Sequence, residues 1–222
     1  MLTGNDVVQP VVNYVAANVE SADWKRKYAA LIALGSITEG PGKQNFLDIV
    51  LPTLPRLLEM FKDTSPKVRE AISWVTSRIC EHHADVVKGP QVAAQVLPIL
   101  KEALKDKPRI SNQCCAAFEK LSAACHPLED EPSNCITPYF GDVLQILYAN
   151  TSRTDYQGTG VDLMQASYMT MTSMVQNACS SSNAIIFDLL VPVLQTLEGS
   201  LSGQAGSPEK AKSMQDQLCG LL

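Results

Sequence analysis

The feature that most constrains the fold of this 222-residue sequence is an internal repeat of about 42 residues. An apolar segment, a polar turn and a second segment of helical periodicity occur in this order five times. The segment Leu54 to Asp63 (LPRLLEMFKD) aligns with Leu97 to Asp106 (LPILKEALKD) at a shift of 43 residues. Repeats of this length predict a fold built from copies of one unit, each packing on its neighbours.

The second segments of the repeats align at a shift of 42 residues and carry apolar residues at every third or fourth position. The best-defined stripe consists of Val68, Ala71, Ile72, Val75, Thr76 and Ile79. Its equivalents are Ile110, Gln113, Cys114, Ala117, Phe118 and Leu121 in the following copy, and Arg26, Ala29, Ala30, Ala33, Leu34 and Ile37 in the preceding one. Only Arg26 and Gln113 break the pattern, so the second segments are predicted to be helices.

The unit of about 42 residues with two helices fits HEAT or armadillo repeats, which span about 40 to 47 residues, better than the 34-residue tetratricopeptide repeat. No segment alternates between apolar and polar residues as a strand would. We therefore predict an all-α fold, an α-solenoid of about five HEAT repeats with two antiparallel helices each. The expected repeats are 6–40, 46–83, 90–125, 136–179 and 184–222.

Helix boundaries follow from capping residues and from glycine-proline pairs. Asp23 and Ser65-Pro66 are predicted to begin helices, and Gly40-Pro41-Gly42 and Gly89-Pro90 to end them. The chain begins at once with a repeat and ends in Cys219-Gly220-Leu221-Leu222, without polar caps. We therefore expect it to be a segment of a longer solenoid.

Composition excludes several classes of protein. The formal net charge is −5, so there is no basic field to hold nucleic acid. The apolar stretch Ala184 to Leu194 contains Asp188 and Pro192 and is shorter than the ~18 to 20 residues of a membrane span, so no membrane is expected. The seven cysteines lie mostly in helical apolar segments, which is typical of reduced thiols in a reducing compartment.

No catalytic motif surrounds the three histidines, so the chain is not expected to be an enzyme, and no cofactor is expected. Cys80, His82 and His83 would meet Cys125 of the next copy, with His126 nearby, and could together hold a metal ion. However, this spacing lacks the paired cysteines of structural zinc sites, and histidines at helix ends commonly bind the last carbonyl groups. We therefore predict no metal, and we interpret Cys114-Cys115 as packing residues.

Trp74 is the residue that points most clearly to binding. At 100° per residue it lies about 130° from the centre of the apolar stripe, so its indole should be at least partly exposed. The predicted partner-binding residues on the same face of this and adjacent copies are Trp74, Glu70, Ser77, Glu81, Glu39, Asn112 and Glu119. An exposed aromatic residue among carboxylates favours a basic peptide or helix as ligand. The alternative is that Trp74 packs against a neighbouring repeat.

Several motifs resemble the central part of the importin-β (karyopherin-β) family of nuclear import receptors. They are Asp23 to Ala30 (DWKRKYAA), Ala33 to Pro41 (ALGSITEGP), Val68 to Ala71 (VREA), Arg78 to Glu81 (RICE), Pro108 to Ile110 (PRI) and Cys115 to Phe118 (CAAF). The resemblance is strongest up to about Cys125. It implies HEAT repeats whose second helices line a concave surface.

In that family, central repeats wrap the basic importin-β-binding segment of the adaptor importin-α with acidic residues and a series of tryptophans. Trp74 matches one of these tryptophans, and Ala116 stands where the resemblance would place the next. Full-length members also bind Ran and phenylalanine-glycine nucleoporins, contacts expected to be weak or absent here. The resemblance implies location in the cytoplasm, the nucleus and the nuclear pore.

The leading hypothesis is thus a non-catalytic segment of a nuclear transport receptor that binds a basic adaptor or cargo segment on its concave face. The alternative is a non-catalytic HEAT scaffold of the phosphatase-regulatory type, which holds enzyme subunits through its inter-helix loops. The two hypotheses differ in the surface that binds, which is the concave face in the first and the loop ridge in the second.

Overall fold

The computed structural model describes residues 4–127 and 132–202, together with residues 212, 215, 216, 219 and 220. Every regular element in this part of the chain is helical, which confirms the predicted all-α class. The α-helices are α1 (Val8–Asn18), α2 (Trp24–Ser36), α3 (Lys43–Glu59), α4 (Pro66–His82), α5 (Ala84–Val87), α6 (Pro90–Ala103), α7 (Pro108–Ala124), α8 (Phe140–Asn150), α9 (Leu163–Gln176) and α10 (Asn183–Leu201). Short 3-10 helices are η1 (Gly4–Val7), η2 (Met60–Lys62), η3 (Thr137–Tyr139) and η4 (Ser180–Ser182).

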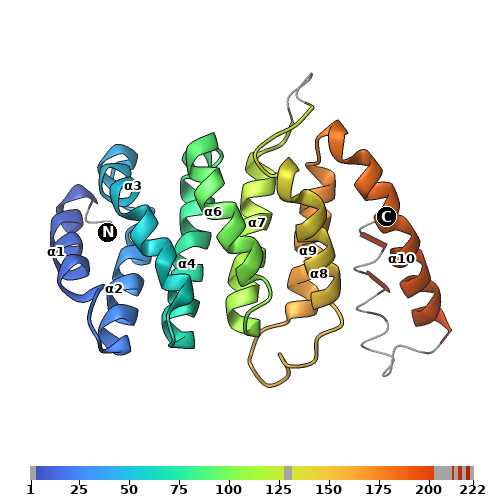
Figure 1. Ribbon diagram of the computed structural model, residues 1–222, viewed down its shortest axis with the longest axis horizontal. Coiled ribbons are helices and arrows are strands. Elements are labelled where there is room, and N and C mark those ends of the chain that lie inside the picture. The colour runs from blue at the N-terminus through green and yellow to red at the C-terminus, as the bar shows by residue number, and fades with distance from the viewer. Residues whose placement is uncertain (1–3, 128–131, 203–211, 213–214, 217–218, 221–222) are drawn as a thin grey trace.

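The helices stack side by side along the long axis of the molecule in two layers (Figure 1). The second helices α2, α4, α7 and α9 each contact the next in this order. In the other layer α1 contacts α3, α3 contacts α6, and α6 contacts η3, which leads into α8. The arrangement is an α-solenoid, as the repeat predicts. Much of the fifth expected repeat, 184–222, lies outside the described residues beyond α10.

Helix starts follow from side-chain caps and from prolines. The Asp23 carboxylate accepts a hydrogen bond from the Lys25 backbone N–H at the start of α2, and Asp162 does the same for Gln165 at the start of α9. Pro66 begins α4, as predicted. Gly89-Pro90, predicted to end a helix, directly follows the end of the short helix α5 and also begins α6, with Gly89 as the N-cap and Pro90 as the first residue. The short helix α5 lies between the expected second and third repeats, 46–83 and 90–125.

The predicted apolar stripes form the core between the two layers. All six positions of the α4 stripe and five of the six α7 positions are buried, with Gln113 half-buried. In α2, Ala30, Leu34 and the following Ile37 are buried, whereas Arg26 is exposed. A helix in a solenoid therefore buries the stripe that the period of 3.6 residues identifies.

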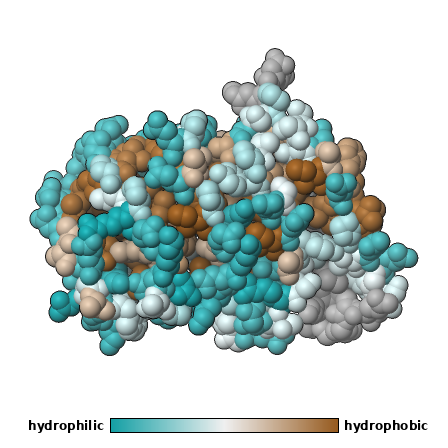
Figure 2. All heavy atoms as spheres, in the orientation of Figure 1, coloured by the Kyte–Doolittle hydropathy of each residue, from teal (hydrophilic) through white to brown (hydrophobic). Residues whose placement is uncertain are grey.

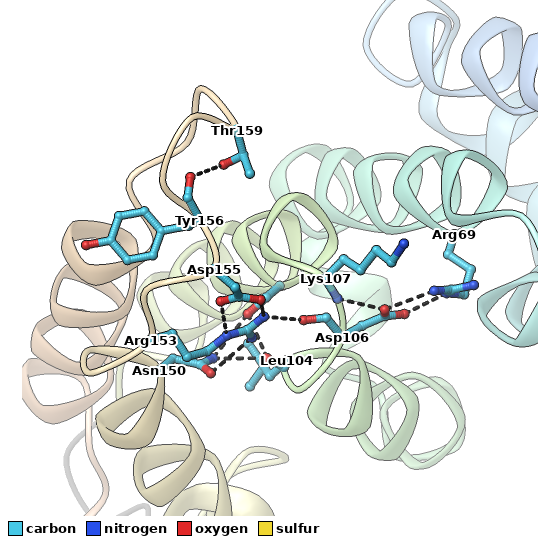
Figure 3. A network of polar contacts seen from close by, with 10 residues as sticks. Arg69, Leu104, Asp106, Lys107, Asn150, Arg153, Asp155, Tyr156 and Thr159 are labelled. Atoms are coloured by element: carbon cyan, nitrogen blue, oxygen red, sulfur yellow. Dashed lines mark hydrogen bonds and ion pairs between the residues drawn. The ribbon is translucent and has the colours of Figure 1, made fainter.

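Polar contacts join successive repeats where the first helix turns into the second (Figure 3). Arg69 at the start of α4 donates to both carboxylate oxygens of Asp106, at 2.6 and 3.0 Å, and Lys27 pairs with Asp63 one repeat earlier at 2.6 Å. Arg153 donates to the Asp106 carbonyl oxygen at 2.9 Å. Burial opposes the ionisation of Asp63 and Asp106, but hydrogen bonds from Lys27 and Arg69 lower the pKa of each carboxyl below its ordinary value.

Helix α10 differs from the others in its surface. Together with η4 it forms a 22-residue segment, Ser180–Leu201, that is long and apolar enough by length and composition to cross a membrane. The sequence argument against a membrane span considered only the shorter stretch Ala184 to Leu194, which contains Asp188 and Pro192. Here α10 packs as a solenoid helix, because Val193 is buried and the Tyr148 hydroxyl of α8 contacts the Pro192 carbonyl oxygen at 3.1 Å. Figure 2 shows apolar side chains reaching the surface at this end.

Candidate functional site

The predicted strip of binding residues crosses the layer formed by α2, α4 and α7. Trp74 lies midway along α4 and is half-buried. Its indole lies directly on Gly35 of α2, where a β-carbon at residue 35 would overlap the ring atom Cζ3 and would lie 2.9 Å from Cε3. Trp74 thus has one side packed on the neighbouring repeat and another side exposed. The ring thus packs on a neighbouring repeat, as the alternative interpretation expected, and is also partly exposed, while its role in binding stays a prediction.

Three of the four carboxylates of the strip, those of Glu70, Glu81 and Glu39, form two ion-pair clusters, one on each side of Trp74. In the first, Glu70 pairs with Lys67 at 2.9 Å and with Arg109 of α7 at 3.4 Å. In the second, Arg78 pairs with Glu81 at 3.1 Å and with Glu39, just beyond α2, at 3.4 Å. Each cluster therefore joins α4 to one neighbouring repeat. On α4, Glu70 lies one helical turn before Trp74 and Arg78 one turn after it.

The basic members of the clusters were not predicted from the sequence. Arg78 and Arg109 are each 39 residues after the glutamate of the preceding repeat with which they pair. This equal spacing, slightly shorter than the repeat, is the signal that could have identified them. Around the Trp74 ring the strip therefore carries carboxylates paired with arginine or lysine, and not a row of free carboxylates.

Three other predicted site residues are less accessible than the helical wheel suggested. Ser77 is only 8% exposed, so the prediction that it contacts a partner is not supported by its position. Because α4 has a neighbouring helix on each side, polar residues flanking the apolar stripe, such as Ser73, are also buried. Asn112 and Glu119 on α7 are half-buried, and the Glu119 backbone carbonyl accepts a hydrogen bond from Ser173 at 3.2 Å.

The cysteine and histidine residues considered for metal binding have structural contacts. His83 is 3% exposed, stacks on Phe46 with ring centroids 4.7 Å apart, and its Nε2 lies 2.9 Å from the Thr38 carbonyl oxygen. Burial lowers the pKa of His83, which favours the neutral ring. His126 instead contacts Asn177 through Nδ1 at 2.9 Å. Within the part of the chain that the structure describes, no three His, Cys, Asp or Glu side chains are placed to hold a metal ion.

Comparison with known proteins places this architecture in a family. The sequence profile described as importin subunit beta-1-like, TPR repeats, matches residues 95–222, and a HEAT repeat profile matches residues 53–83. Importin subunit beta-1 of Arabidopsis thaliana is 27% identical over 228 residues, which cover 99% of this chain and 26% of that protein. The chain thus spans about a quarter of the length of this relative.

Solved structures agree with the sequence comparison. A crystal structure of importin beta in an ammonium sulfate condition matches with a TM-score of 0.87 and 26% identity, covering 99% of this chain and 26% of that one. The Kap95:Nup1 complex shares the fold, with a TM-score of 0.83 and 23% identity over 98% of this chain and 25% of that chain. The predicted HEAT solenoid and the resemblance in sequence are therefore confirmed, and the chain belongs to the importin subunit beta-1-like family of repeat proteins.

Proposed function

We propose that this chain is the part of a nuclear transport receptor that binds a basic segment of an adaptor or cargo on the α2–α4–α7 strip. The observation that carries the proposal is the half-exposed Trp74 between two clusters of paired charges. Family membership supports transport over the phosphatase-type scaffold and over catalysis. A receptor of this kind would move between cytoplasm and nucleus.

The ion-pair clusters suggest how a basic ligand would bind. The exposed fraction of the side chain is 63% for Glu39, 38% for Glu81 and 51% for Arg109, and it is lower for Glu70, at 24%, and Arg78, at 27%. Exposed pairs contribute only about 0 to 1 kcal/mol each, so breaking them costs little. A ligand guanidinium could therefore replace Arg78 or Arg109 at its glutamate, while Arg78 or Arg109 turns to solvent.

Trp74 would supply the fixed element of the site. Packing on Gly35 holds the indole in place before a ligand arrives, so little conformational entropy is lost on binding. A Lys or Arg side chain over the exposed part of the ring would gain a cation–π contact of roughly 0.5 to 2 kcal/mol. With Ala116 at the equivalent position of α7, this strip offers one aromatic contact where the family resemblance implies two. The proposed ligand would thus be held mainly at α4.

The partners of similar proteins give only general support to the proposal. One similar structure is a complex of Kap95 with Nup1, and this chain corresponds to about a quarter of the matched chain in that complex. Contacts of this chain with nucleoporins or with Ran are expected to be weak or absent. The adaptor segment remains the partner that the strip itself favours.

The proposal is tested by binding of a basic importin-α amino-terminal peptide to the whole chain at several salt concentrations. Glu70→Lys combined with Glu81→Lys should weaken binding about tenfold, mostly through slower association, and should reduce the dependence on salt. Glu102→Lys is the matched control, because Glu102 on α6 also pairs with a lysine three residues away but lies in the other layer. Equal effects of the strip and control variants would overturn the proposed surface.

A further inference from the structure

Two thiols lie against each other at the junction of the third and fourth helix pairs. Cys125 is the C-cap residue of α7, and Cys135 lies two residues before η3. Their Sγ atoms are 3.6 Å apart. Cys125 is 7% exposed, whereas Cys135 is only half-buried. Cys135 is therefore the more accessible residue of the two.

The backbone on both sides of this pair is fixed by hydrogen bonds. The Cys125 N–H donates to the carbonyl oxygens of Leu121 and Ser122 in the last turn of α7. Asn134, the neighbour of Cys135, donates from Nδ2 to the Cys125 carbonyl oxygen at 3.0 Å and accepts from the Ile136 N–H at 2.9 Å. The two cysteines are thus held together by groups other than their own side chains. A sulfur–sulfur bond would require the two Sγ atoms to approach from 3.6 Å to about 2.05 Å.

The two sulfurs are chemically different. The contact between the sulfurs lowers the pKa of Cys135 and raises the pKa of Cys125, which favours Cys135 as the thiolate of the pair. The charge of Lys88 also favours the Cys135 thiolate. Oxidants react with the thiolate form of an accessible cysteine and convert it to a sulfenic acid. A neighbouring thiol can then condense with the sulfenic acid to form a disulfide.

The buried core cysteines of α4 and α7 lack these properties. Cys80 and Cys115 are 0% and 1% exposed, and burial raises the pKa of each to about 12. Burial likewise raises the pKa of Cys114, which is fully buried. Cys219 is exposed, but in the described part of the chain no other cysteine sulfur is recorded in contact with it. Cys135 therefore combines a contact with a second thiol, partial exposure and a lowered pKa.

We propose that Cys125 and Cys135 form a reversible disulfide, making this junction an oxidation-sensitive modification site. With hydrogen peroxide as oxidant, the Cys135 thiolate attacks one peroxide oxygen and becomes a sulfenic acid, while the other oxygen leaves as water after protonation. The Cys125 thiol then attacks the Cys135 sulfur and a second water leaves. Two thiols and one peroxide thus give one disulfide and two waters, and a dithiol reductant restores the thiols.

The disulfide would act on the joint between repeats. The connector also contacts the α9–α10 turn, because the Pro132 carbonyl oxygen accepts hydrogen bonds from the Ser181 N–H at 3.2 Å and from its hydroxyl at 2.5 Å. A covalent link between α7 and the residues before η3 would fix this three-way junction. The expected consequence is a more rigid solenoid between its third and fourth helix pairs, with a higher melting temperature.

The test is a treatment of the whole folded chain with hydrogen peroxide, followed by alkylation and tryptic digestion. Lys120 and Arg153 are consecutive tryptic sites, so one peptide, residues 121–153, contains Cys125 and Cys135 and no other cysteine. We expect this peptide to lose about 2 Da and to take up no alkylating reagent, and both changes to reverse with dithiothreitol. The core cysteines should still be alkylated after unfolding.

Variants separate the pair from general oxidation. Cys219→Ser should leave the disulfide unchanged, whereas Cys125→Ser should leave Cys135 to proceed to a sulfinic acid, a gain of about 32 Da. The oxidised wild type should melt at a higher temperature than the reduced protein, and Cys135→Ser should show no such difference. Two alkylated cysteines in peptide 121–153 after peroxide treatment, or disulfides formed only between molecules, would overturn the proposal.

Discussion

Helices α4 and α10 are similar in length but differ sharply in burial. α4 has 17 residues and α10 has 19, and nine residues of α4 are buried against two of α10, Val193 and Ser200. In contrast, Phe187, Val191 and Leu194 of α10 are 68%, 58% and 50% exposed. The more apolar of the two helices is thus the more exposed.

The difference shows that neighbours set burial in a solenoid more than the composition of a helix does. α4 has α2 on one side and α7 on the other, besides its own partner helix, so even its serines are covered. The described contacts of α10 come from one side, including Tyr148 and Gly141 of α8. Stability should therefore be concentrated in the middle of the described solenoid.

The largest expected effect contrasts two phenylalanines. Phe118→Ala on α7 removes a ring that is 0% exposed and should lower the free energy of unfolding by about 3 to 5 kcal/mol. Phe187→Ala on α10 removes an exposed ring and should change it by less than about 0.5 kcal/mol. Urea unfolding followed by circular dichroism measures both. A similar loss of unfolding free energy in the two variants would contradict the conclusion that the central helices are more stabilising than α10.

A second prediction concerns the contact between α2 and α4. Gly35→Ala would place a methyl group on the Trp74 indole and should destabilise the protein by about 1 to 3 kcal/mol. In a Trp74→Ala background the same change should cost far less, because the overlapping ring is gone. The four proteins of this double-mutant cycle are compared by thermal and urea unfolding. Additive losses would show that the two residues do not touch.

A third prediction concerns pH and contrasts a buried with an exposed histidine. Burial lowers the pKa of His83 in the folded state, so the unfolded chain binds the proton more readily as the pH falls below about 6.5. The contribution of His83 to the free energy of unfolding is therefore complete above that pH. Below it, the contribution should fall by up to about 1.4 kcal/mol per pH unit until the pH reaches the pKa of His83 in the folded protein. His83→Gln should flatten this dependence, and His126→Gln, at an exposed position, should preserve it.

The smallest expected effect concerns the surface pairs of the strip. Arg109→Ala breaks an ion pair with Glu70 in which the arginine side chain is 51% exposed. It should reduce stability by less than about 1 kcal/mol, and less at high salt, since exposed pairs are screened. Unfolding at low and high ionic strength measures the change. A loss as large as that from Phe118→Ala would mean that the strip is part of the stabilising core.

The helical stripes and the stacking order could be predicted from sequence because both follow from one period and one repeat length. Val68 to Ile79 and its copy in α7 are buried as the pattern indicates. The start of α6 at Gly89-Pro90 could not be predicted from the sequence, because the same dipeptide is compatible with either end of a helix. Local sequence offered no sign of the short helix α5 before it.

The candidate site was only partly predictable. Helical periodicity placed Trp74 at the edge of the core, but its contact with Gly35 depends on how closely α2 approaches α4. The burial of Ser77 arises from the same neighbouring helices. The pairing of Cys125 with Cys135 depends on the path of a connector that has no periodicity. The features of the site that the sequence did not predict therefore arise from contacts between helices and connectors, and not from contacts within one helix.

The most direct test of the proposed binding strip measures the affinity of the basic importin-α amino-terminal peptide for Trp74→Ala, with thermal unfolding of the same sample. Trp24→Ala is the matched control, since Trp24 is 42% exposed at the start of α2, away from the strip. We predict that Trp74→Ala binds about 5- to 150-fold more weakly below its melting temperature, a loss of roughly 1 to 3 kcal/mol, and that Trp24→Ala binds like the wild type. A large loss of stability with unchanged affinity in folded Trp74→Ala would contradict the proposed site.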